Sequence, residues 1–181
     1  NRFGRGWLRP GGVRHAIDAA RRQDLIDTLA AFARDFTQVN ELMLGARSVR
    51  SRLIGTGILG TQAARELGLV GLAARASGVA RDSRHELPGG VYREHPLPLL
   101  TEDSGDCWAR MRLRMREIDA SLHWLRGQLQ DAVSGLAGEA LRPIDALLAD
   151  SLCISVREGF RGPVVQVLET GADGRLLHCK V

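Results

Sequence analysis

The chain has 181 residues and a mass of 19.7 kDa, enough for one ordinary domain. Hydrophobic residues make up 44% and charged residues 25%, close to globular averages, which argues against disorder, collagen and coiled-coil arrays. The longest apolar run, Leu69 to Ala74, is far shorter than the roughly twenty residues of a membrane-spanning helix, so we expect no direct membrane span.

The net charge of +4 arises from basic and acidic residues that alternate along the chain. A nucleic-acid-binding domain concentrates its cations on one stretch or face, so we expect no nucleic-acid partner. Cys107, Cys153 and Cys179 lie far apart without a CxxC spacing. This pattern argues for a reducing compartment and against a disulfide framework or a cysteine metal site.

Two long segments carry apolar residues at alternating steps of four and three, which predicts two amphipathic helices over 16–44 and 106–130. The first stripe is Leu25, Leu29, Phe32, Phe36, Val39 and Met43, and the second is Met111, Met115, Ile118, Leu122, Leu125 and Leu129. Helices of similar length with such seams pack lengthwise, and we expect an antiparallel pair. Shorter helices are expected over 61–67 and 143–149.

After Asp150 the period changes to two, and the turn-like segment 170–174 separates two further apolar runs. The sequence therefore predicts a mainly α fold, a bundle built on two long helices with a long ordered loop and a small C-terminal antiparallel β-sheet. We expect a helical core over 1–150 and a small β appendage over 151–181 that is cut short at its end.

The segment 71–105 has no sustained periodicity, and it is rich in charge. Loops of this length in compact domains are often functional. Arg75, Asp82 and Arg84 are expected to be buried and ion-paired, with the loop folded onto the second long helix near Asp106 and Arg110. Two interpretations remain: a proton-relay or anion-binding cluster, or a loop held in shape by its own ion pairs, which is the commoner case.

Several motifs then occur in one order along the chain: 9–13 (RPGGV), 52–59 (RLIGTGIL), 74–79 (ARASGV), 82–84 (DSR) and 105–110 (GDCWAR), followed by Arg114, Glu117 and Ser121. This order resembles the large catalytic subunit of energy-converting NiFe hydrogenases of the formate hydrogenlyase type. It is also similar to the quinone-site subunit of NADH:quinone oxidoreductase (complex I). Ala76 and Ala109 favour the hydrogenase branch, whereas Pro163 stands where the family has Glu after the 158–162 motif.

The resemblance implies a central fragment of a large subunit, scaffolding a proton-coupled redox site and inactive alone. Its charged network would comprise Arg75, Asp82, Arg84, Asp106 and Arg110. The implied parent would hold a NiFe centre or a quinone, but both CxxC pairs and the quinone-binding His and Tyr lie outside this chain, so we expect no cofactor and no metal here, and no catalytic residue is assigned.

The implied partners are an iron–sulfur small subunit and membrane subunits. The implied location is the cytoplasmic side of the inner membrane, with peripheral attachment through those partners. The alternative function is a non-catalytic interaction module that kept the fold without metal or quinone sites.

Overall fold

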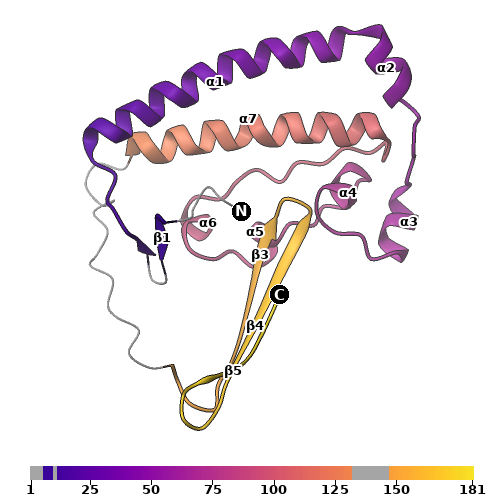
Figure 1. Ribbon diagram of the computed structural model, residues 1–181. Coiled ribbons are helices and arrows are strands. Elements are labelled where there is room, and N and C mark those ends of the chain that lie inside the picture. The colour runs from indigo at the N-terminus through magenta and orange to yellow at the C-terminus, as the bar shows by residue number, and fades with distance from the viewer. Residues whose placement is uncertain (1–5, 10–11, 132–146) are drawn as a thin grey trace.

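The computed structural model describes residues 6–9, 12–131 and 147–181 (Figure 1). Its elements in chain order are β1 (Leu8–Arg9), β2 (Gly12–Val13), α1 (Ala19–Gly45), α2 (Arg47–Leu53), α3 (Thr61–Glu66), α4 (Gly71–Ala76), α5 (Ser83–Glu86), α6 (Val91–Glu94), α7 (Cys107–Asp131), β3 (Leu152–Gly159), β4 (Gly162–Thr170) and β5 (Leu176–Lys180). The mainly α fold with a small antiparallel sheet is confirmed.

The two long helices lie side by side and run in opposite directions (Figure 1). Both were expected, and their observed bounds differ from the expected ones by three residues or fewer. The side chain of Asp18 caps α1 by accepting a hydrogen bond from the backbone N–H of Arg21 at 2.8 Å, which satisfies one of the free amides of the first turn. The short helix α3 was also expected, whereas the one expected over 143–149 falls mostly outside the described residues.

The buried face of α1 is rotated from the expected stripe. Leu25, Phe32, Val39 and Met43 are exposed by 37% or more, while Asn40 is the buried residue of this helix. On α7 the deepest side chains include Ala109 and Leu113, neither of which belongs to the expected stripe. The stripe was drawn from large apolar residues alone, and α7 buries a second face against α4 that such a stripe does not describe.

The segment 71–105 contains three helices that the sequence did not predict. Helix α4 packs on α7 through a core of Leu72, Ala76, Ala109 and Leu113, with Leu100 against it. A second cluster of Ala64, Ala74 and Val79 joins α4 to α3. Helices of four to six residues are too short to show a helical period, so only their contacts reveal them.

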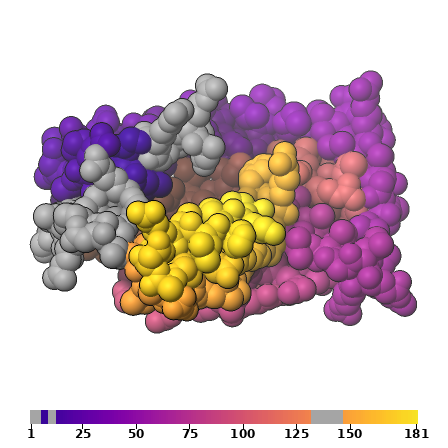
Figure 2. All heavy atoms as spheres, turned by 60° about the horizontal axis from the view of Figure 1, so that its bottom comes forward, coloured from indigo at the N-terminus to yellow at the C-terminus, as the bar shows by residue number. Residues whose placement is uncertain are grey.

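The C-terminal strands form an antiparallel sheet in the order β3-β4-β5, as expected, and the turn after Thr170 is present. Strands β1 and β2 form a separate small pair that was not expected. In Figure 1 the sheet extends away from the helices as an arm. The edge strand β5, coloured yellow, lies uncovered on the near face of the molecule (Figure 2).

The arm reaches the helical core where β3 contacts α5 and where the tip of the β3–β4 hairpin contacts α4. Gly71 begins α4 with φ at +62°, and a Cβ there would collide with the backbone of Arg161 and Gly162. Only glycine combines that backbone conformation with this close approach. The hairpin tip is therefore seated on the first turn of α4.

Candidate functional site

The charged residues beside this contact form one group, here called the Arg75 cluster: Arg75, Asp82, Arg84, Glu117 and Glu158. The side chains of Arg75, Asp82 and Glu158 are buried, and those of Arg84 and Glu117 are partly buried. Arg75 is 3% exposed and comes from the last turn of α4. Its Nη1 lies 3.0 Å from Glu158 Oε1 and 3.4 Å from Asp82 Oδ2, and its Nε and Nη2 each lie 2.9 Å from Glu117 Oε1. Nη1 also donates to the carbonyl oxygen of Arg81 at 3.1 Å.

Asp82 joins the second arginine to the first. Its carboxylate accepts from Arg84 Nε at 2.9 Å and Nη2 at 2.6 Å, a bidentate pair, and from the backbone N–H of Arg84 at 2.9 Å. The last bond caps α5, whose turn brings Arg84 back over the Asp82 side chain. The expected ion pairs among Arg75, Asp82 and Arg84 are therefore present in the structure.

Two carboxylates of the cluster were not among the site residues predicted from the sequence. Glu117 lies on α7, and Glu158 lies near the end of β3, 42 and 83 residues from Arg75. Glu158 also accepts from the backbone N–H of Ser83 at 3.1 Å. Both glutamates stand in motifs of the family resemblance, which was the available signal for them.

Asp106 and Arg110 form a separate group, and the single five-residue network that the resemblance implied is divided into two. Asp106 precedes α7 and accepts from the backbone N–H of Ala109 and of Gly55, each at 2.8 Å. Arg110 donates from Nη2 to the carbonyl oxygens of Gly57 and Gly105, at 2.6 and 2.8 Å. These two residues thus cap α7 and fasten segment 55–57 to it.

The electrostatics of both aspartates favour the ionised form. Burial by itself would raise the pKa of Asp82, but hydrogen bonds from the Arg84 side chain and backbone, with the positive charges of Arg84 and Arg75, lower it below the ordinary value. Burial likewise opposes ionisation of Asp106, and hydrogen bonds from Ala109, Gly55 and Ser104 outweigh it, so its pKa is also lowered. The hydrogen bond to Asp82 raises the pKa of Arg84.

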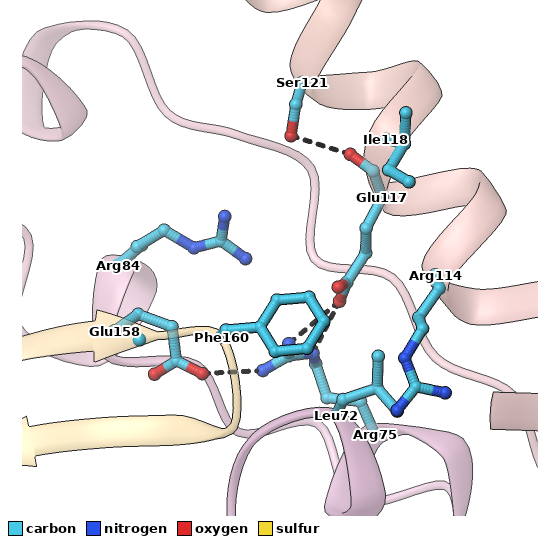
Figure 3. Close-up of a pocket in the computed structure, with 10 residues that line it drawn as sticks. Leu72, Arg75, Arg84, Arg114, Glu117, Ile118, Ser121, Glu158 and Phe160 are labelled. Atoms are coloured by element: carbon cyan, nitrogen blue, oxygen red, sulfur yellow. Dashed lines mark hydrogen bonds and ion pairs between the residues drawn. The ribbon is translucent and has the colours of Figure 1, made fainter. Parts of the chain in front are cut away.

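A cavity of about 430 Å³ opens beside the Arg75 cluster (Figure 3). Arg75, Arg84, Glu117 and Glu158 line it together with Leu72, Arg114, Ile118, Ser121, Gly159 and Phe160. Figure 3 shows Phe160, from the hairpin tip, lying in front of the Arg75 guanidinium. The cavity has the size and mixed polar and apolar lining of ligand sites.

Metal-ligating side chains are scattered over the part of the chain that the structure describes. Among the described residues no three His, Cys, Asp or Glu side chains come together in a way that could hold a metal ion. Cys107, Cys153 and Cys179 are free thiols at separate places. We therefore derive no chemistry through a metal centre on these residues.

The fold is that of a chain from a respiratory membrane complex. This chain superposes on one chain of a solved structure, described as the membrane-bound sulfane sulfur reductase, an archaeal respiratory membrane complex, with a TM-score of 0.85. The match covers 96% of this chain and 48% of that chain at 21% identity, so it shows a shared fold.

The family follows from the sequence comparison. Residues 1–142 match the family model of the respiratory-chain NADH dehydrogenase 49 kDa subunit, and the chain belongs to that family. It is 33% identical to a subunit of F(420)H(2) dehydrogenase from Methanosarcina mazei, over 65% of this chain and 31% of that protein. It is 32% identical to a subunit of NADH-quinone oxidoreductase from Bacteroides thetaiotaomicron, over 75% of this chain and 26% of that protein. The matched region is thus a third or less of these relatives' length.

Proposed function

We propose that this chain is the part of an oxidoreductase large subunit that scaffolds a proton-coupled redox site in a membrane-associated complex, and that it is inactive alone. The observation that carries the proposal is the family match over 1–142, which contains Arg75, Asp82, Arg84, Asp106 and Arg110. Buried ion pairs with complete partners hold a backbone in one arrangement, which is the task of a scaffold beside a reaction site.

The printed names of the relatives support a role that is independent of the electron donor. One relative is named for F(420)H(2) and another for NADH, yet both share this region with the chain at similar identity. Enzymes with different electron donors share this region, so its role is expected to be one that does not involve the donor. We infer that donor selection lies elsewhere in the complex.

The choice between a hydrogenase and a complex I-like enzyme depends on Ala76 and Ala109. Both are fully buried, 0% and 1% exposed, in the cluster that packs α4 on α7. Their identity is thus accounted for by packing, since an aspartate at 109 would need a buried partner. We therefore propose the general class, a complex I-like or hydrogenase-like subunit, and leave the donor to experiment.

The proposed partners are an iron–sulfur small subunit and membrane subunits, which would hold this chain peripherally at the cytoplasmic face of the inner membrane. In the part of the chain that the structure describes, no helix combines the length and apolar character needed to cross a bilayer. Attachment through partner subunits is consistent with that finding.

Affinity purification from the membranes of the native host tests the proposal. The protein carries a tag at its chromosomal locus, and the solubilised complex is assayed for dye reduction with H₂, NADH and F(420)H(2). We expect co-purification of iron–sulfur and membrane proteins and activity with one donor. Recovery of the tagged protein without redox subunits would favour the interaction module instead.

The purified 181-residue chain provides the second arm of the test. It is assayed under the same conditions as the complex, and we expect no turnover with any of the three donors. Robust dye reduction by the chain alone would contradict its role as a scaffold.

A further inference from the structure

One end of the helical part carries arginines with no acidic residue between them. Residues 42–65 contain four arginines and neither aspartate nor glutamate, so basic and acidic residues do not alternate here. Helices α2 and α3 lie along this stretch, at the right-hand edge of the molecule in both views (Figure 1, Figure 2). Residues 47–67 are here called the basic end. Its four arginines against one glutamate leave a net charge of +3, from Arg47, Arg50, Arg52, Arg65 and Glu66.

The arginines of the basic end have no carboxylate partner in the part of the chain that the structure describes. All four are exposed, and none forms an ion pair with a described aspartate or glutamate. Arg50 lies over the ring of Trp108 at the start of α7, with its Cζ 5.7 Å from the ring centroid. Arg110 adds a cation nearby, since it donates to the carbonyl oxygen of Gly57. Asp106, the acid closest to Arg110 in the sequence, is 3% exposed and accepts from backbone N–H groups.

Apolar side chains are exposed between these charges. Ile54 and Ile58, in the segment that joins α2 to α3, are 48% and 65% exposed, and Leu67 after α3 is 69% exposed. A single exposed aliphatic residue is ordinary on a protein surface. Three of them among four unpaired arginines form a surface that is both cationic and apolar. Segments that bind at the boundary of a lipid bilayer combine these two properties.

We propose that the basic end binds the surface of an anionic lipid bilayer. The guanidinium groups of Arg47, Arg52 and Arg65 bond to lipid phosphates, and Ile54 and Ile58 enter the boundary between headgroups and acyl chains. This contact adds to the attachment through partner subunits proposed above, and it does not depend on the redox function.

The exposed side chains favour a bilayer over a nucleic acid. Proteins that bind single-stranded nucleic acids stack bases on aromatic rings. The basic end exposes aliphatic side chains instead, and Trp108 beside it is covered by the guanidinium of Arg50. Aliphatic side chains gain free energy in the acyl boundary of a bilayer, which a phosphodiester backbone does not offer.

Co-sedimentation of the purified 181-residue chain with vesicles tests this binding. Vesicles of phosphatidylglycerol mixed with phosphatidylcholine are compared with vesicles of phosphatidylcholine alone. We expect binding to the mixed vesicles that is about tenfold or more tighter than to the neutral ones, and that weakens as NaCl screens the charges. Equal binding to both vesicles, or none to either, would overturn the proposal. Binding of polyglutamate or of an oligonucleotide without binding of vesicles would assign the surface to an acidic protein or a nucleic acid and also overturn it.

A pair of double variants tests the role of the charges. Arg47→Gln with Arg52→Gln should weaken binding to the mixed vesicles about tenfold or more, because each arginine at an anionic surface contributes roughly fivefold to the affinity. Arg81→Gln with Arg175→Gln is the control, which removes the same charge from exposed arginines outside the basic end. The control should change binding by about twofold or less. Equal weakening by the two pairs would mean that the vesicles respond only to overall charge, which would overturn the proposal.

A second comparison tests the aliphatic contact. Ile58→Ser should weaken binding about tenfold, because the lost side chain no longer enters the acyl boundary. Leu152→Ser on β3 is the matched control, since Leu152 is 64% exposed and lies outside the basic end, and it should leave binding unchanged. Melting curves check that each variant folds. Unchanged binding by Ile58→Ser would mean that this side chain does not enter the bilayer and would overturn the assignment to a lipid surface.

Discussion

Arg75 is a buried cation whose charge is tolerable only because carboxylates surround it. Its side chain and that of Asp82 are 3% and 2% exposed, and Glu158 is 4% exposed. Desolvating each of these ions costs several kcal/mol, which the mutual contacts offset. Removing one member therefore leaves the others buried and uncompensated.

The first prediction concerns Asp82. Asp82→Ala should lower the free energy of unfolding by roughly 3–5 kcal/mol, because Arg75 and Arg84 lose a shared partner inside the protein. Glu86→Ala is the matched control, since Glu86 pairs with Arg81 in the same segment but both side chains are about half exposed. The control should cost about 1 kcal/mol or less. Urea unfolding measures both, and equal losses would contradict a buried cluster.

The pH dependence of stability is the second prediction. The pKa values of Asp82 and Asp106 are lowered in the folded protein. Their contribution is therefore complete above the unfolded-state pKa of about 3.9 and is lost as the pH falls through the lowered values. The wild type should lose stability steeply below about pH 4, and Asp82→Asn should show a shallower acid loss. Parallel curves of urea midpoint against pH would contradict this.

Part of the Arg75 cluster could be predicted from the sequence. Arg75, Asp82 and Arg84 lie within ten positions of one another, so their pairing follows from local charge and the need to neutralise buried groups. Glu117 and Glu158 come from a helix and a strand that meet Arg75 only in the folded chain.

At the scale of elements, Gly71 of α4 and Gly127 of α7 differ in the space that an added Cβ would have. Gly71→Ala would place a Cβ against the Arg161 backbone at a φ of +62°, so two obstacles act together. Gly127 lies within α7 and has open space where a Cβ would go.

The third prediction uses this contrast. Gly127→Ala should stabilise the protein by about 0.5–1 kcal/mol, as expected for a helix interior. Gly71→Ala should destabilise it by about 1–3 kcal/mol, the usual cost of backbone strain, and should move the hairpin tip. Thermal unfolding gives the signs, and the amide shifts of 158–162 report the displacement. A stabilising Gly71→Ala would mean that the tip is not seated on α4.

Hydrophobic periodicity in the sequence predicts some of the secondary-structure elements, whereas others depend on tertiary packing. The two long helices follow from repeats sustained over more than twenty residues, and the hairpin follows from alternation with a glycine-containing turn. Which face of each helix is buried does not follow, because small residues such as Ala109 allow the closest approach and yet contribute little to an apolar stripe. Helix α4 contacts α7, and helix α5 contacts β3. Tyr92 of α6 lies against Trp124 of α7. These short helices are therefore fixed by packing rather than by their own sequence.

On the scale of the whole molecule, the sheet meets the helical part through the end of β3 and the start of β4, which contact α5 and α4. Glu158 provides the charge contact to Arg75 and Ser83, and Gly162 provides the backbone contact to Gly71. The division into a core over 1–150 and an appendage over 151–181 was drawn from the change of sequence period. The structure adds that the appendage supplies a carboxylate that the buried arginine of the core requires.

The last prediction follows from this shared cluster. If Glu158 completes the charge balance of the core, Glu158→Ala should lower hydrogen-exchange protection in 71–76 and 107–117 as well as in the hairpin. The loss should be roughly 3–5 kcal/mol, because the variant leaves Arg75 buried with one partner fewer. Glu169→Ala is the control on the same sheet. Glu169 pairs with His178, both side chains are about half exposed or more, and its loss should stay local and cost about 1 kcal/mol or less. Mass-spectrometric exchange distinguishes the cases. Protection lost only in the strands of Glu158→Ala would mean that the sheet is an independent appendage, whereas loss that spreads to α4 and α7 would mean that both parts unfold together.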